Sequence, residues 1–239
     1  MSRFLEVPQL PEGSVCELAM GGEYFRMLRE PLEGRGIRCI ALPPNPALDP
    51  RIAFHADLSL LHLGGENFVG AEELSFDSDF PVISKVPTYT NDCALNVCIV
   101  GDYAIACPEY ASVLPEEKTL IAVRQRYARC SVCIVDEHSI ITADPGIARA
   151  CGDLLDVLLI APGYIELPGF DYGFIGGASF KLSKYQLAFT GSLDEHPDKK
   201  RIERFLQDRG VRPVYLTEEN CFDCGSAVLL REKNEKLLP

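Results

Sequence analysis

The chain has 239 residues, of which 47% are hydrophobic and 24% are charged, and its formal net charge at pH 7 is -12. It can therefore bury a core, and because no Ser/Gly-rich linker or block of charge divides it, we expect a single domain over residues 1–239. The acidity and the lack of a Lys/Arg cluster exclude nucleic acids and anionic membranes from the expected partners.

The N-terminal sequence and the cysteines bear on cellular location. The first eight residues lack the continuous apolar region of a signal peptide, and no run approaches the roughly 20 apolar residues of a membrane span. We therefore expect a cytoplasmic protein. Its ten cysteines are then expected to be buried small hydrophobic residues rather than disulfide partners.

The N-terminal part of the chain predicts a strand, a helix and a second strand. Residues 14–19 (SVCELA) form the first apolar run, the segment 24–32 is amphipathic with helical spacing, and the apolar run 37–42 (IRCIAL) follows. This order resembles the second half of a unit that is clearest further along the chain.

That unit lies at residues 129–163. An apolar run at 131–135 is followed by a polar turn and a β-branched run at 139–142, which is typical of a hairpin. Asp144 is then expected to cap a helix that begins at the following proline, and the apolar run 157–161 closes the unit as a strand. The unit is therefore strand, strand, helix, strand.

The same pattern recurs five times at a period of tens of residues, which indicates a repeat architecture. Closing strands are predicted at 37–42, 80–86, 119–123, 157–161 and 211–216. The first hairpin strands are predicted to begin with the triplets His55-Ala-Asp57, Thr90-Asn-Asp92, Ala128-Arg-Cys130, Gly169-Phe-Asp171 and Cys221-Phe-Asp223. The second hairpin strands are predicted at 68–70, 103–107, 139–142 and 186–190.

A fifth second hairpin strand is missing from the C-terminal part. The strand at 14–19 is its best candidate, and it would pair with a strand at 226–230. The N-terminal strand would then close a ring. The sequence therefore predicts an α/β protein of five ββαβ units around a pseudo-fivefold axis.

Four of the five triplets carry aspartate at the third position, namely Asp57, Asp92, Asp171 and Asp223. If the repeat register holds, these carboxylates ring the axis at one level, repel one another and need a cation, such as a positively charged small molecule. The alternative is that each caps a loop or strand locally. Arg129, near the same level, is expected to neutralise part of the ring.

Two CxxC pairs, Cys130 with Cys133 and Cys221 with Cys224, raise the question of zinc. Both pairs are predicted to open strands, where residues three apart point to opposite faces, and neither follows a strand and begins a helix as a redox CxxC should. We therefore expect no metal and no cofactor.

The repeats resemble the pentein superfamily, which includes arginine deiminases, amidinotransferases and dimethylarginine dimethylaminohydrolases. The non-enzymatic translation initiation factor six shares this fold. Within the superfamily the chain is most similar to an uncharacterised bacterial group, on residues 128–148, 162–177 (PGYIELPGFDYGFIGG) and 189–198 (FTGSLDEHPD). The resemblance covers nearly the whole chain and implies a five-bladed α/β propeller.

The resemblance also implies a site at one mouth of the axis, where a cysteine and a histidine act on a guanidinium held by carboxylates. Cys224, followed by Ser226 and Leu229, looks like the nucleophile of the deiminases. The histidine of the fourth unit is absent, because Gly169 occupies its place before Asp171.

His55 can replace that histidine, because it occupies in the first unit the position of Gly169 in the fourth. The first and fifth units are neighbours in the ring, so His55 can approach Cys221 or Cys224. Since Asp223 and Cys224 are consecutive, only one of them faces the axis in a regular strand.

Two classes of function follow. One is an acidic small-molecule site related to the guanidine- and amidine-modifying enzymes, either a cysteine hydrolase that uses Cys224 with His55 and Asp171, or a binding site with Asp57, Asp92, Asp223, Arg129 and Cys221. The other is a non-enzymatic interaction protein like the initiation factor. The sequence predicts neither the substrate nor the oligomeric state.

Overall fold

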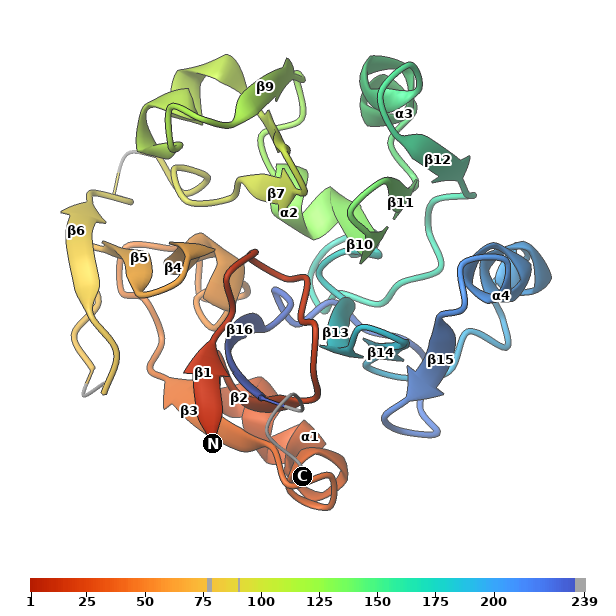
Figure 1. Ribbon diagram of the computed structural model, residues 1–239, viewed down its shortest axis with the longest axis horizontal. Helices are drawn as coiled ribbons and strands as arrows, with labels where there is room; N and C mark the ends of the chain where they lie inside the picture. The colour runs from red at the N-terminus through yellow and green to blue at the C-terminus, as the bar shows by residue number, and fades with distance from the viewer. Residues whose placement is uncertain (77–78, 90, 235–239) are drawn as a thin grey trace.

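The computed structural model describes residues 1–76, 79–89 and 91–234, and within them the strands form five small sheets in a mixed α/β fold. Figure 1 shows the five sheets arranged around a common centre. The first combines β16 (Val228–Lys233), β2 (Val15–Gly21) and β3 (Arg38–Leu42), with β1 (Ser2–Phe4) at its edge. The others are β4 (Leu60–Gly64), β5 (Asn67–Ala71) and β6 (Val82–Val86); β7 (Cys98–Val100), β8 (Tyr103–Ala106) and β9 (Thr119–Ala122); β10 (Val132–Asp136), β11 (Ser139–Thr142) and β12 (Asp156–Leu159); and β13 (Ser179–Ser183), β14 (Gln186–Phe189) and β15 (Arg212–Tyr215).

Every sheet contains an antiparallel pair followed by a strand parallel to the second member, as in β10-β11-β12. The parallel connection needs a crossover, and within the residues that the structure describes, four of the five crossovers contain helix. These helices are α1 (Gly22–Glu33), the 3-10 helix η2 (Pro108–Val113), α3 (Pro145–Cys151) and α4 (Lys199–Gln207). The five predicted closing strands are thus present, each with its bounds shifted by one or two residues.

The N-terminal strand completes the last sheet, as the sequence predicted. β16 lies between β1 and β2, and its register with β2 pairs Val228 with Ala19 and Leu229 with Leu18. All four side chains are buried, so the pairing also joins the two ends of the described chain through its core.

The start of α3 follows the predicted cap. The side chain of Asp144 accepts hydrogen bonds from the N–H groups of Gly146 (2.7 Å) and Ile147 (2.9 Å), which satisfies two donors of the first helical turn. Pro145 occupies the first helical position, where its missing N–H costs nothing. The helix ends at Cys151.

The triplets that were predicted to open the first hairpin strands do not open strands, and that prediction is wrong. Residues 56–58 form a 3-10 helix (η1, Ala56–Leu58), residues 128–131 form a short helix (α2, Ala128–Ser131), and 169–171 and 221–223 belong to no strand. Thr90 lies outside the described residues. The side-chain directions at these positions are therefore set by turns, and strand alternation does not apply.

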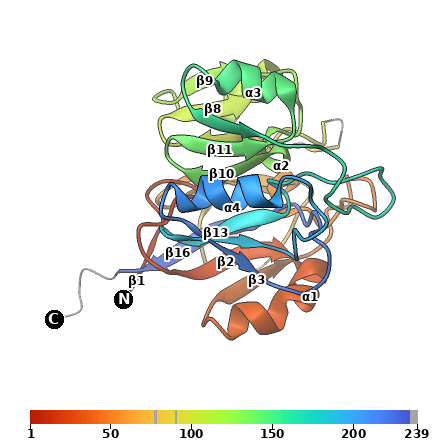
Figure 2. The ribbon, with the colours of Figure 1, turned by 90° about the vertical axis from the view of Figure 1, so that its right-hand side faces the viewer.

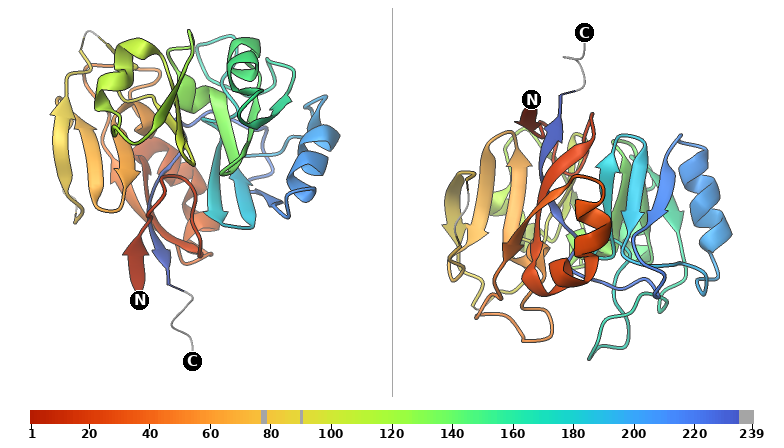
Figure 3. Two further views of the ribbon diagram at one scale, coloured as in Figure 1. Left: turned by 45° about the horizontal axis from the view of Figure 1, so that its top comes forward. Right: turned by 90° about the horizontal axis from the view of Figure 1, so that it is seen from below.

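Long connections on one edge of the sheets enclose the site described below. Figures 2 and 3 show the connections that follow β3 and β12 projecting from the same edge of the molecule. Arg51 links them, because its Nη1 donates to the carbonyl of Gly169 (2.7 Å) and its guanidinium lies 4.2 Å from the centre of the Phe170 ring. Among the described residues, no helix combines the length and apolar character that crossing a membrane requires.

Candidate functional site

Three chain segments bring His55, Cys130 and Asp223 together in the lining of one pocket, and Asp57, which does not line it, contacts Cys130. His55 and Asp57 come from the turn around η1, Cys130 comes from α2, and Asp223 precedes β16. All four residues are buried. His55, Cys130 and Asp223 line a pocket of about 160 Å³.

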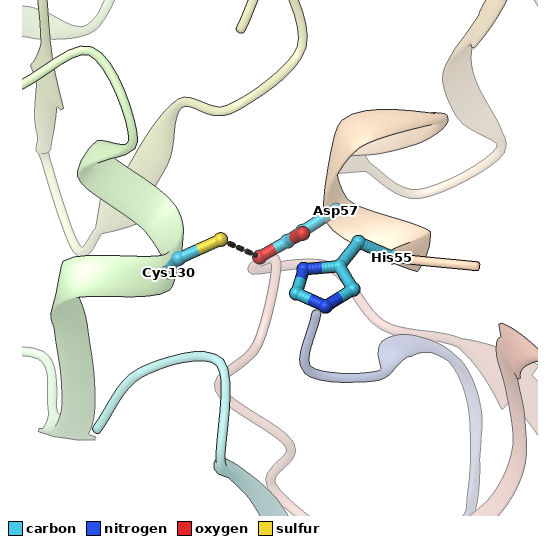
Figure 4. Close-up of side chains that lie close together, drawn as sticks. All are labelled: His55, Asp57 and Cys130. Atoms are coloured by element: carbon cyan, nitrogen blue, oxygen red, sulfur yellow. Dashed lines mark hydrogen bonds between the residues drawn. The ribbon is translucent and has the colours of Figure 1, made fainter. Parts of the chain in front are cut away.

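Asp57 and Cys130 are joined directly. The thiol of Cys130 donates a hydrogen bond to Oδ2 of Asp57 (2.9 Å), as the dashed line in Figure 4 marks. Asn96 fixes the cysteine from the other side, because its Nδ2 donates to the sulfur (3.2 Å) and its Oδ1 accepts from the backbone N–H of Cys130 (3.2 Å). The other carboxylate oxygen of Asp57, Oδ1, has no hydrogen-bond partner within the described residues.

His55 is held between Asp223 and the backbone of Gly225. Its Nδ1 lies 3.9 Å from Oδ1 of Asp223, and a Cβ on Gly225 would come within 2.4 Å of the Cα and Cβ of His55. Gly225 also has a φ of 68°, which favours glycine, and its carbonyl accepts from the N–H of Asp57 (3.2 Å). The other ring nitrogen of His55, Nε2, has no partner among the described residues.

The carboxylate of Asp223 is positioned by backbone donors. Oδ2 accepts from the N–H of Phe174 (2.8 Å), and Oδ1 accepts from the N–H of Gly225 (2.9 Å). A Cβ on Gly177 would lie 2.0 Å from Oδ1, so this position needs a glycine for the carboxylate to fit. Asp223 therefore faces the pocket with a fixed orientation.

Burial and nearby negative groups set the pKa values of Asp57 and Cys130. Burial raises the pKa of Asp57 to about 6; His55 opposes this rise and the nearby Asp223 adds to it. Burial, followed by the charges of Asp57 and Asp223, raises the pKa of the Cys130 thiol well above its ordinary value. In the structure the thiol is thus a hydrogen-bond donor to a carboxylate and is not a preformed thiolate.

Aromatic and aliphatic side chains form the walls of the pocket. Phe170 and Tyr172 are partly exposed at the mouth, whereas Tyr127 and Phe174 lie deeper, with their ring centres 6.5 Å apart and nearly parallel. The remaining wall residues are Ile52, Leu58 and Leu167. The pocket therefore combines an apolar, aromatic wall with one lining carboxylate, that of Asp223, while the carboxylate of Asp57 lies next to the lining Cys130.

The four predicted aspartates do not form one ring. Asp57 and Asp223 lie close enough for the charge of Asp223 to act on Asp57, but only Asp223 of these two lines the pocket described here. Asp92 does not line it and accepts a hydrogen bond from the hydroxyl of the lining Tyr127 (2.6 Å). Asp171 is exposed and lines a different cavity with Glu166, so the prediction that it shares the site is wrong.

The two cysteines that were predicted for the site lie in the core. Cys224 packs in a hydrophobic cluster with Phe180 and Leu229, and its thiol is directed to the carbonyls of Gly177 (3.4 Å) and Ser226 (3.7 Å). Burial, followed by the charge of the neighbouring Asp223, raises the pKa of this thiol well above its ordinary value.

Cys221 packs in a second cluster, beside the hydroxyl of Thr190 (3.5 Å). Neither Cys221 nor Cys224 lines the pocket. Of the consecutive residues Asp223 and Cys224, Asp223 lines the pocket and Cys224 packs in the core; both lie outside the strands, so the alternation on which the expectation rested does not apply.

Arg129 is buried beside the site without an ion pair among the described residues. Its guanidinium donates to the carbonyls of Val132 (3.2 Å) and Gly176 (3.4 Å) and to the hydroxyl of Ser226 (2.5 Å). Its charge still lowers the pKa of Asp57, although burial outweighs it. The expected partial neutralisation is therefore electrostatic and involves no direct contact.

Comparison of the chain with models of protein families identified one family. The model of a family of unknown function (DUF6873) matches residues 20–228. The chain belongs to this family. One solved structure similar to it is SxtG, an amidinotransferase from Microseira wollei in the saxitoxin biosynthetic pathway, with 10% identity, a TM-score of 0.48 and coverage of 92% of both chains. No curated protein matches the chain.

In this DUF6873 protein, the residue that sequence reasoning missed is Cys130. One ring nitrogen of His55, one carboxylate oxygen of Asp57 and the sulfur of Cys130 lie within 4.8 Å of one another, so the three can hold a metal ion (Figure 4). The sequence did contain a signal, since Cys130 stands at the third position of its triplet, where the other four triplets carry aspartate.

Proposed function

We propose that the pocket binds a small organic cation with a guanidinium or amidine group, and that the five sheets are the ββαβ blades of a pentein-type α/β propeller. The observation that carries the first part is the buried carboxylate of Asp223, which lines an aromatic pocket, together with a second buried carboxylate, Asp57, that is hydrogen-bonded to the pocket-lining Cys130. Within the described residues neither has a lysine or arginine at ion-pair distance. Two buried carboxylates that lack a direct ion pair with lysine or arginine favour a cation in a shielded site.

The shape of the pocket supports a planar cation. Guanidinium and amidine groups donate in-plane hydrogen bonds to carboxylates, and their faces pack favourably on aromatic rings. Tyr127 and Phe174 provide such faces beside the carboxylates, and about 160 Å³ accommodates a small head group.

Cys130 gives the site potential for thiol chemistry on such a cation. A cation bound in the pocket beside Asp223 and Cys130 would bring positive charge to the thiol, which lowers its pKa and opposes the effect of the two aspartates. His55, with Nε2 unpaired within the described residues, is then the available proton carrier. The primary function proposed is binding, with chemistry dependent on the bound cation.

The arrangement of the sheets supports the proposed α/β propeller. Each sheet repeats the same order of antiparallel and parallel strands, and β2 completes the sheet of β16. The cytoplasmic location and the absence of a nucleic-acid partner, which composition suggested, remain predictions.

Isothermal titration in the presence of EDTA tests the binding proposal with arginine, agmatine and citrulline. Citrulline replaces the guanidinium with a neutral ureido group, so it is a matched ligand without the charge. We expect arginine or agmatine to bind and citrulline to bind at least about tenfold more weakly. Asp223→Asn should weaken cation binding, whereas Asp171→Asn should leave it unchanged. Equal affinity for arginine and citrulline would overturn the proposal.

A further inference from the structure

His55, Asp57 and Cys130 have the composition of a transition-metal site. Nitrogen, oxygen and sulfur ligands together suit zinc, whereas calcium and magnesium prefer oxygen alone. The three ligand atoms lie within 4.8 Å of one another and come from residues that are all buried. In tetrahedral zinc sites, with bonds of about 2.0–2.3 Å, ligand atoms are about 3.3–3.8 Å apart, so small side-chain rotations suffice.

Two atoms of this cluster lack partners. Oδ1 of Asp57 and Nε2 of His55 are buried and make no hydrogen bond within the described residues, and the ring nitrogen of His55 that faces Asp57 in Figure 4 is Nδ1. Leaving buried polar atoms unpaired is costly, so such atoms point to a bound group. Within the described residues, Oδ2 of Asp57 accepts a hydrogen bond from the thiol of Cys130 alone, and a metal displaces the proton of that thiol.

A metal site also needs outer contacts that orient its ligands and room for a fourth ligand. Asn96 holds the sulfur and the backbone N–H of Cys130 (both 3.2 Å), and such outer contacts orient metal ligands. The pocket, lined by His55 and Cys130, leaves room for a fourth ligand from solvent.

We propose that His55, Asp57 and Cys130 bind one zinc ion, with an open coordination position toward the pocket. Binding forms a zinc–sulfur bond and releases the thiol proton to solvent. The charges of the zinc ion, the Cys130 thiolate and the Asp57 carboxylate then sum to zero beside a neutral imidazole. The inference goes beyond the proposed function, which concerns an organic cation. Zinc and an organic cation compete for the same negatively charged residues.

Cobalt substitution of EDTA-treated, full-length protein tests the site. Zinc affinity is measured by titration, and cobalt is followed by its near-ultraviolet thiolate charge-transfer band. We expect one metal ion per chain and a band that Cys130→Ser abolishes, with zinc affinity reduced more than about 100-fold. Cys130→Ser keeps a donor to Asp57, so the variant should fold.

Two further variants sharpen the result. Cys107→Ser changes a partly buried cysteine outside the pocket and should leave both the band and the affinity unchanged. Asn96→Ala should weaken zinc binding about 10- to 100-fold, because it removes an orienting contact from the ligand. A band that persists in Cys130→Ser, or the lack of saturable zinc binding to the wild type, would overturn the inference. Agmatine titration in EDTA reports on the organic-cation site separately.

Discussion

The thiol of Cys130 donates a hydrogen bond to Asp57 across 2.9 Å, although the two residues are 73 positions apart in the chain. A buried carboxylate is usually paired with a lysine or an arginine. Here its direct partner is a weak, neutral donor, which leaves negative charge in the site. The predictions below follow from this contact and from the segments that hold it in place.

The pH dependence of stability should reveal Asp57. Burial raises its pKa to about 6 from 3.8, so its contribution to stability is fully present below about pH 4 and is lost as pH rises through 6. This rise corresponds to about 3 kcal/mol. Asp57→Asn is neutral at every pH, so its free energy of unfolding relative to wild type should increase between pH 4 and pH 8 by up to that amount.

Urea unfolding at pH 4, 6 and 8 measures this difference. The exposed Asp171 supplies the control, since Asp171→Asn should show no such trend. A difference between Asp57→Asn and wild type that stays constant with pH would contradict the assignment.

Gly225 should be essential for the placement of His55. Gly225→Ala puts a Cβ 2.4 Å from the backbone of His55 and strains a φ of 68°. We expect loss of cation binding together with destabilisation of more than about 1 kcal/mol. Gly210 has a φ of 66° but no atom within 4 Å of the added Cβ, so Gly210→Ala isolates the backbone strain. Cation binding by calorimetry and stability by urea unfolding are measured for both variants. Equal losses of cation binding in Gly225→Ala and Gly210→Ala would refute the role of Gly225 in placing His55.

Arginine deiminase activity should be absent or depend on Cys130. We expect no appreciable formation of citrulline from arginine at neutral pH, because burial and two carboxylates keep the pKa of the thiol high. Any turnover that a citrulline assay detects should disappear in Cys130→Ser and persist in Cys224→Ala. Turnover that requires Cys224 would show that the pocket described here is not the active site.

Removal of β2 should unfold the protein. Deletion of residues 1–20 takes away the strand between β16 and β3, including the buried Leu18, and leaves edges unpaired on both sides. The matched control is deletion of residues 1–4, which removes only the edge strand β1. Circular dichroism melting should show no cooperative transition for the longer deletion and a retained one for the shorter. A normal transition for the longer deletion would show that β2 does not complete the fold.

Repetition made the strands predictable, whereas the site depended on irregular segments. Apolar runs and the Asp144 cap are local signals, and the pairing of residues 14–19 followed from counting the units. The side-chain directions of Asp171 and Cys130 could not be derived in this way. Both residues lie in turns or in a short helix, where the strand alternation that was assumed does not apply.

The placement of β16 between β1 and β2 also has a consequence during synthesis. β2 ends at Gly21 and β16 begins at Val228, so at about 5–20 residues per second a nascent chain waits roughly 10–40 s for its partner strand. Asp223 and Gly225, which hold His55, emerge at nearly the same time as that strand. The ribosome-bound chain therefore cannot assemble the pocket before translation has passed these residues, and a chaperone that shields β2 would act before any ligand can bind.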